Sequence, residues 1–193
     1  MAGGPPGCTF ESLPALVATS DVVVFGTVES AQPGPVIRQE PFPSSDPKVQ
    51  DDKPTDVLVD VRRREVTVRV EQQFFGAPVE SKIILEQAGY EGEQAYELSG
   101  TPWLFPGDRA VFFAQENAGT GHYRIMLAGQ WVIEQTGTVS TFDTDTHPIL
   151  AAIDGKPWAA VAANIRTAAD DVRAGNASPV NVPYARPGPQ RCG

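Results

Sequence analysis

The residues best suited to chemistry lie close together in a short segment late in the chain. Asp143, Asp145 and His147 alternate with threonines. In an extended backbone, side chains two positions apart point to the same face, so two carboxylates and an imidazole would face one way. Oxygen and nitrogen donors arranged in this manner can bind a divalent cation. The alternative, which we favour, is a polar loop that leads into Pro148.

The rest of the chain gives little support for catalysis. The only other histidine is His122, and the sequence has no HExxH motif, nucleophile elbow or phosphate-binding glycine loop. Cys8 lies in a segment rich in proline and glycine, where nothing suggests a base that would activate its thiol. The sequence therefore predicts a protein that is not an enzyme and that needs no cofactor.

The two cysteines, Cys8 and Cys192, lie near opposite ends of the chain. A disulfide between them would close almost the whole chain into one loop and stabilise the fold by roughly 4–5 kcal/mol. Such a bridge would indicate an oxidising compartment, and two free thiols are the equally weighted alternative. Gly7-Cys8 also resembles the end of a lipoprotein cleavage site, so a lipid on Cys8 is a further hypothesis.

Aromatic side chains in the second half of the chain could form a stacking surface. Small β-barrels use such surfaces to bind sugars or single-stranded nucleic acids. The alternative, which we favour, is that these side chains fill the core and the barrel ends. The set comprises Trp103, Phe105, Phe112, Phe113, Tyr123 and Trp131, of which Trp103, Phe105, Tyr123 and Trp131 are our candidate binding residues.

Charge and hydropathy exclude several classes of partner. The chain has 193 residues, with 15 Lys and Arg against 24 Asp and Glu, and a formal net charge of −9. An acidic surface repels the phosphates of nucleic acids and of anionic membranes, so we expect neither as a partner. No apolar run approaches the roughly 18 residues that a transmembrane helix needs. Residues 1–7 lack the charged start and apolar middle of a signal peptide, so we expect none within this sequence.

The elements that must position these residues are mainly strands. Val66, Val68 and Val70 alternate with polar residues, which predicts a strand whose valines face the interior. The valines at 57, 59 and 61 have the opposite phase, so a bulge or turn is needed across residues 62–65. Arginines occupy positions 62–64, and we interpret them as a solvated strand edge, with an anion site as the alternative.

Turn residues and helical spacing place the remaining elements. A short helix follows the N-cap Ser12, a buried strand spans 22–28 with a bulge or bend at Gly26, and a long proline-rich loop covers 31–55. Residues 87–98 are polar and contain glycine, and we expect loops at the barrel end in this region. Further strands are expected at 83–85, 109–114, 122–127, 130–134 and 138–142, with a turn at 128–129. An amphipathic helix is predicted over 158–173.

Together these elements predict a mainly β protein with helices. We expect a closed antiparallel OB-like β-barrel, a short N-terminal helix, and a long C-terminal amphipathic helix packed on the barrel. Residues 12–175 would form this single domain, with the insertion 31–55. Residues 1–11 would be an N-terminal remnant or linker, and residues 176–193 an extended tail.

The order of these segments resembles a known group of proteins. An opening cysteine is followed by LPALVATSD, VVVFGTVES, VTVRVEQQFFG, SKIILEQ and GTPWLFPGDRAVFFAQE, and then by GQW. This order is similar to bacterial extracytoplasmic domains whose barrel resembles the N-terminal domain of tissue inhibitors of metalloproteinases, the netrin-like group. In the eukaryotic inhibitors the mature chain begins with a Cys-x-Cys motif, and the free amine and carbonyl of the first cysteine bind the zinc of the target. Here Phe10 replaces the second cysteine, so the resemblance implies the fold and an extracytoplasmic location rather than protease inhibition.

These observations predict a secreted or surface-tethered, non-enzymatic binding domain. Its partner would be a protein at the cell surface or in the medium, bound through loop 31–55 and the barrel-end loops near 87–103. A barrel that binds a carbohydrate or small ligand through exposed aromatic residues is the alternative. A metal-binding protein that uses Asp143, Asp145 and His147 is the third hypothesis.

Overall fold

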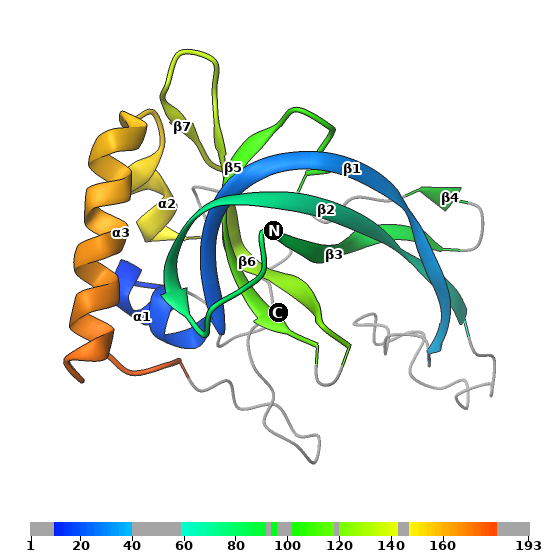
Figure 1. Cartoon of the computed structure of the whole chain (residues 1–193), viewed down its shortest axis with the longest axis horizontal. Coiled ribbons are helices and arrows are strands. Elements are labelled where there is room, and N and C mark those ends of the chain that lie inside the picture. Colours follow the sequence, from blue (N-terminus) through cyan, green and yellow to red (C-terminus); the bar gives the residue numbers. More distant parts are fainter. Residues whose placement is uncertain are drawn as a thin grey trace, which may run out of the picture.

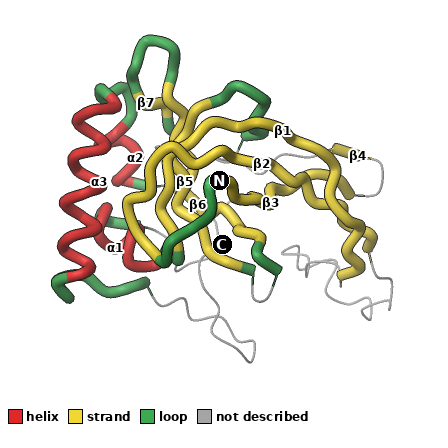
Figure 2. The backbone as a smooth tube through the Cα atoms, viewed as in Figure 1, coloured by secondary structure: helices red, strands yellow, loops and turns green. Residues whose placement is uncertain are grey.

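The computed structural model describes residues 10–39, 59–91, 94–95, 102–117, 120–142 and 147–180. Three helices lie together on one side of a strongly curved sheet (Figures 1 and 2). The helices are α1 (Leu13–Thr19), α2 (Pro148–Ile153) and α3 (Trp158–Arg173). The strands are β1 (Val22–Gln39), β2 (Val59–Gly76), β3 (Lys82–Glu91), β4 (Gln94–Ala95), β5 (Arg109–Glu116), β6 (His122–Ile133) and β7 (Val139–Ser140).

Five of the strands close into a barrel, in the order β1, β2, β3, β6, β5 and back to β1. Neighbouring strands are antiparallel with one exception. β3 and β6 pair in parallel, through Ile84 with His122, Leu85 with Tyr123 and Glu86 with Arg124. The predicted closed barrel is therefore confirmed, and it is mixed rather than purely antiparallel. This architecture is consistent with an OB-like fold.

The part of the barrel wall formed by β1, β5 and β6 is buried on both faces. One face fills the interior, where Val66, Val68, Leu85 and Phe112 are almost completely inaccessible to solvent. The other face of β1, β5 and β6 packs against the helices through a second cluster. In β5 the side chains alternate between the two clusters, with Phe112 inside the barrel and Phe113 toward the helices. This explains why β5 reads as a continuous apolar run.

The helix that covers the barrel was predicted with the bounds that the structure shows. α3 buries Val161, Ile165 and Ala169 in the outer cluster. Trp158 at its start packs against Phe25 of β1, with ring centroids 4.7 Å apart. α1 likewise begins as predicted, because the Ser12 Oγ accepts a hydrogen bond from the backbone N–H of Ala15 at 3.4 Å.

Two segments predicted as irregular contain strands. β1 continues to Gln39, well into the predicted loop 31–55, and pairs with β2 as far as Val59. Residues 40–55 lie outside the described residues. β3 extends to Glu91, and β4 follows within the stretch 87–98 that we expected to be irregular. The reason is that long partner strands supply backbone hydrogen bonds, which override a weak local preference.

The turn predicted at 128–129 is wrong, because β6 is one strand that bends there. Ala128 has a φ of 61°, and the pairing with β5 loses its register between Phe112 and Ala114. A side chain on Gly129 would approach the carbonyl oxygen of Phe113 to 2.6 Å, so only glycine fits beside this bulge.

The run of arginines at 62–64 lies inside the sheet rather than at its edge. β2 pairs with β1 on one side and β3 on the other, and Arg64 is only 6% exposed. The interpretation as a solvated edge is therefore wrong. The bulge predicted across 62–65 is confirmed, because the pairing with β3 shifts register between Arg62 and Arg64. The second predicted bulge is also present, at Gly26.

The two faces of β3 provide a test of the barrel interior. Leu85 is fully buried in the interior cluster, whereas its neighbour Ile84 is half-buried on the opposite face. We expect Leu85→Ala to lower the free energy of unfolding by about 2–5 kcal/mol, because it leaves a cavity in the packed barrel. Ile84→Ala is the control and should cost clearly less. Urea unfolding measures both, and equal losses would contradict this assignment of faces.

Candidate functional site

The predicted metal segment is described only at its last residue. His147 is buried at the N-cap position of α2, and its ring stacks on Phe10 with centroids 6.5 Å apart. Asp143 and Asp145 lie outside the described residues, as do Cys8 and Cys192. Within the described part of the chain, no three His, Cys, Asp or Glu side chains are grouped so that they could hold a metal ion. The metal site and the disulfide therefore stay predictions.

Three of the six aromatic residues belong to the core. Trp131 is fully buried, packs against Phe113 in a tilted arrangement with ring centroids 4.5 Å apart, and donates a hydrogen bond from Nε1 to the carbonyl oxygen of Ala128 at 2.7 Å. Phe112 lies inside the barrel. Trp131 was a candidate binding residue, but its burial removes it from any surface. The core interpretation holds for these three residues.

Trp103 and Phe105 form a small cluster around a buried cation. The guanidinium of Arg64 lies 4.9 Å from the ring centroid of Trp103 and 5.3 Å from that of Phe105. Phe105 is 55% exposed, and it is the one large hydrophobic side chain in the described residues with such exposure. The two rings thus offer an accessible aromatic surface whose position is fixed by an arginine.

Buried amides hold the backbone that carries these rings. The Gln87 side chain donates to Gln130 Oε1 at 2.9 Å and to the carbonyl oxygen of Pro102 at 3.1 Å. Its own Oε1 accepts from Arg64 at 3.0 Å and from the backbone N–H of Leu104 at 3.3 Å. Residues 102–105 are therefore anchored to β3 and β6 before any ligand arrives.

The fourth candidate binding residue, Tyr123, lies on β6 and packs partly against the barrel interior. Burial raises the pKa of its hydroxyl above the ordinary value, and the negative charges of Glu116 and Asp21 raise it further. The hydroxyl is therefore neutral over the physiological pH range.

A histidine and two glutamates lie at the seam where β3 meets β6. His122 Nδ1 is 3.1 Å from Glu86 Oε1 and 3.9 Å from a carboxylate oxygen of Glu65. Glu86 Oε2 also accepts hydrogen bonds from Arg63 at 2.6 Å and Asn117 at 2.7 Å. Because Glu86 already has three partners, this cluster is better suited to holding the seam closed than to transferring protons.

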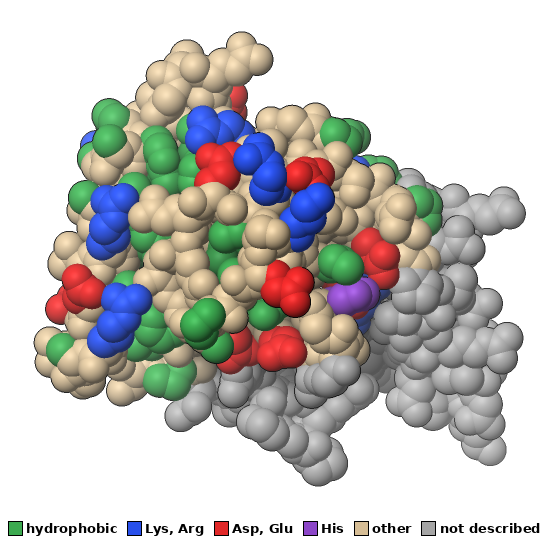
Figure 3. Space-filling model, viewed as in Figure 1, with side chains coloured by type: hydrophobic (Ala, Val, Ile, Leu, Met, Phe, Trp, Pro, Cys, Tyr) green, Lys and Arg blue, Asp and Glu red, His purple; other side chains and the backbone are tan. Residues whose placement is uncertain are grey.

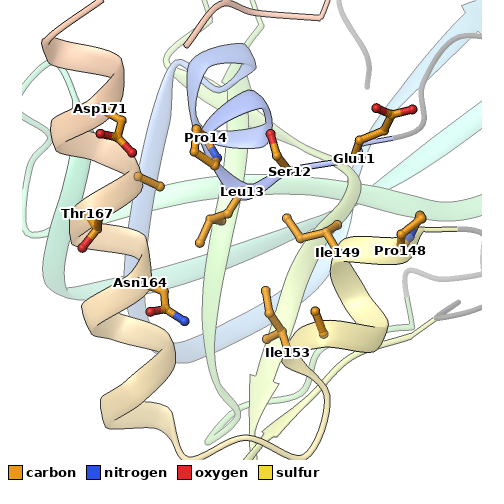
Figure 4. Close-up of a pocket in the computed structure, with 12 residues that line it drawn as sticks. Glu11, Ser12, Leu13, Pro14, Pro148, Ile149, Ile153, Asn164, Thr167 and Asp171 are labelled. Atoms are coloured by element: carbon orange, nitrogen blue, oxygen red, sulfur yellow. The ribbon is translucent and has the colours of Figure 1, made fainter. Parts of the chain in front are cut away.

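An open groove of about 420 Å³ lies between the three helices (Figure 4). Its floor is apolar and comes mainly from Leu13 of α1, Ile149 and Ile153 of α2, and Ala168 of α3. Polar side chains border it. They are Glu11, Ser12, Asn164, Thr167 and Asp171.

The sequence analysis missed this groove because it missed α2. The signal was present: Pro148 suits the first turn of a helix, and Ile149, Leu150 and Ile153 follow at helical spacing. With only six residues, however, α2 is too short to show a convincing period. Neither α1 nor α3 suggests a groove without it.

On part of the outer surface of the barrel, basic and acidic side chains lie next to one another (Figure 3). Glu71 accepts hydrogen bonds from Thr27 at 2.5 Å and from Arg109 at 3.0 Å. Partial burial raises the pKa of Glu71, but these hydrogen bonds and the charges of Arg109 and Arg69 outweigh that effect and lower its pKa below the ordinary value. The network is structural, because its charges are paired with one another.

No family model, curated protein or solved structure matches the chain. The class of protein is defined by the fold itself, which is mainly β with a closed five-stranded, OB-like barrel. Within the described residues, no helix has the length and apolar character required to cross a bilayer.

The lowered pKa of Glu71 predicts a pH-dependent contribution to stability. A carboxylate whose pKa is lower in the folded state stabilises the fold above its unfolded pKa of about 4.3, and this contribution is lost as the pH falls through the folded value. At pH 7, Glu71→Gln should cost ~0.5 kcal/mol, a typical value for an exposed pair. The difference from wild type should shrink as the pH falls below about 4.3, and it should disappear once the pH is below the lowered pKa of the folded state.

Chemical denaturation at a series of pH values measures this effect. Glu80→Gln, which removes an exposed carboxylate from the turn before β3, controls for the loss of one surface charge. A Glu71→Gln penalty that stayed constant down to pH 3 would contradict the pairing with Arg109 and Arg69.

Proposed function

We propose that the protein is an extracytoplasmic, non-enzymatic binding domain that recognises a protein partner through the groove between α1, α2 and α3. The OB-like barrel would serve as the scaffold, as in the netrin-like domains that the sequence resembles. The groove is the observation that carries this proposal, because it has an apolar floor, a polar border and a volume large enough for a ligand. Its volume falls within the range of about 300–1,000 Å³ typical of ligand sites.

The packing of the barrel supports a site outside it. Large side chains such as Phe112, Leu85 and Val68 fill the interior and are inaccessible to solvent. A partner would therefore be recognised on the outer surface. Among the described residues, the groove leaves apolar groups of α2 open to solvent, namely Pro148 and Ala152. Apolar surface with a polar border is typical of an interaction site.

This proposal moves the contact surface away from the loops named in the sequence analysis. Most of loop 31–55 and about half of the segment 87–103 lie outside the described residues. In Figure 1 the helices lie at one side of the barrel, and the far ends of β1 and β2 reach toward the other. The described ends of β1 and β2, which border loop 31–55, therefore lie on a different side of the barrel from the groove.

Filling the groove tests the proposal. Ala152 is exposed on α2 and lines the groove, so Ala152→Trp would occupy it. We expect a partner captured from the culture medium or surface extract of the source organism by the wild-type protein to be lost with this variant. Ala159→Trp is the matched control, because Ala159 is exposed on α3 but does not line the groove. Retention of every captured protein by Ala152→Trp would refute the groove as the contact surface.

A carbohydrate-binding barrel is the second candidate, favoured by the exposure of Phe105 beside Trp103. Sugars stack on such rings, and Trp103 would report the contact because Trp131 is fully buried and Trp158 packs against Phe25 and Phe74. If this function is correct, a glycan panel should contain a member that changes the tryptophan fluorescence, and Phe105→Ala should abolish the change. Phe75→Ala, which removes a half-buried ring near the end of α3, is the control. A panel without any response would remove this candidate.

A further inference from the structure

The charged side chains that line the groove between the helices are all negative. Of the twelve residues that line it, Glu11 and Asp171 are acidic and none is basic. Figure 4 shows their carboxylates on α3 and on the segment that precedes α1. The chain as a whole has a net charge of −9, so this local bias is not offset by the rest of the protein.

The arginines of α3 do not neutralise the groove. Arg166 extends toward β2, where its guanidinium lies over the ring of Phe74 and NH2 approaches Gln72 Oε1 at 3.5 Å. Arg173 donates to the carbonyl oxygen of Phe74 at 2.7 Å and pairs with Asp170 at 2.8 Å. Both cations of the helix are therefore committed to contacts outside the groove.

The floor of the groove favours a ligand with aliphatic side chains. Leu13, Ile149 and Ile153 supply branched apolar walls, and the small side chains of Ala152 and Ala168 leave room between them. Among the described residues that line the groove, none is a cation that would bind a phosphate or a carboxylate. Its chemistry complements a ligand that is apolar in the centre and positively charged beside it.

From this complementarity we infer that the groove binds a short peptide segment of the partner protein in which aliphatic residues adjoin Lys or Arg. The inference rests on the proposed function and specifies the chemistry of its partner. Nucleic acids and anionic lipids are repelled by Glu11 and Asp171. A second copy of this chain is disfavoured for the same reason, since each copy has a net charge of −9. Burial of the aliphatic side chains supplies affinity, while the carboxylates contribute selectivity and association rate.

Fluorescence anisotropy with two synthetic peptides tests the inference. The first alternates leucine with lysine and the second alternates leucine with glutamate, both about ten residues long, which is enough to span a site of this size. We expect the lysine peptide to bind the wild-type protein and the glutamate peptide not to bind. Binding should weaken as salt rises, because the charges at the groove are exposed.

Two variants separate the groove from the general acidity of the protein. Glu11→Gln combined with Asp171→Asn should weaken binding of the lysine peptide roughly 3- to 10-fold, the effect of losing two exposed ion pairs. Glu80→Gln combined with Glu134→Gln changes the net charge equally at exposed positions outside the groove, and should leave binding nearly unchanged. Ala152→Trp should abolish binding. The charge variants preserve the side-chain shape, so they test the inference even if Ala152→Trp does not fold.

Equal weakening by the two double variants would overturn the inference, because the peptide would then be responding only to net charge. Binding of both peptides with equal affinity would overturn it as well. The proposed function has a separate readout. If the natural partner is lost with Ala152→Trp but binding of that partner is unaffected by Glu11→Gln with Asp171→Asn, the groove is the contact surface and the basic peptide is the wrong occupant.

Discussion

Closure of the barrel depends on a short contact between β3 and β6. Only three residues of each strand pair there, in the parallel arrangement, whereas β1 and β2 pair over most of their length. Parallel pairing is slightly weaker per residue than antiparallel pairing, so side chains must reinforce so short a seam. Glu86 does this by joining His122 of β6 to Arg63 of β2. The polar cluster that resembles a catalytic pair is thus explained by the geometry of closure.

Closure also determines where a binding surface can lie. Once the interior is filled, β1 and β5 must bury their outer faces as well, and the helices provide that cover. α3 has sixteen residues, but α1 and α2 have seven and six, which corresponds to about 24 Å against about 10 Å of helix. Because the three helices differ so much in length, they cover the barrel but do not fill the space between one another. The groove follows from this mismatch.

Local patterns in the sequence identify the elements that bury a single face. The valines at 66 and 68 and the stripe of α3 each face one apolar surface, so periodicity places them correctly. Periodicity fails where contacts with distant strands determine the conformation or the burial of a segment. Pro33 and Pro35 suggest a loop, yet β2 pairs with this segment and keeps it extended. Arg64 suggests a solvated edge, but its partners Trp103 and Gln87 come from other parts of the chain. The groove is hidden for the same reason, since no single segment contains it.

The contrast between the two aromatic sets shows why burial must be known before a function is argued. Trp131 and Trp103 look equivalent in the sequence, but one anchors the outer core and the other lies beside the exposed Phe105. Arg64 beside Trp103 is buried and hydrogen-bonded to Gln87, so this surface is aromatic in character, whereas acidic side chains border the groove between the helices. Two surfaces of such different chemistry on one small domain have no reason to share a ligand, so the burial of each side chain has to be known before either surface is tested.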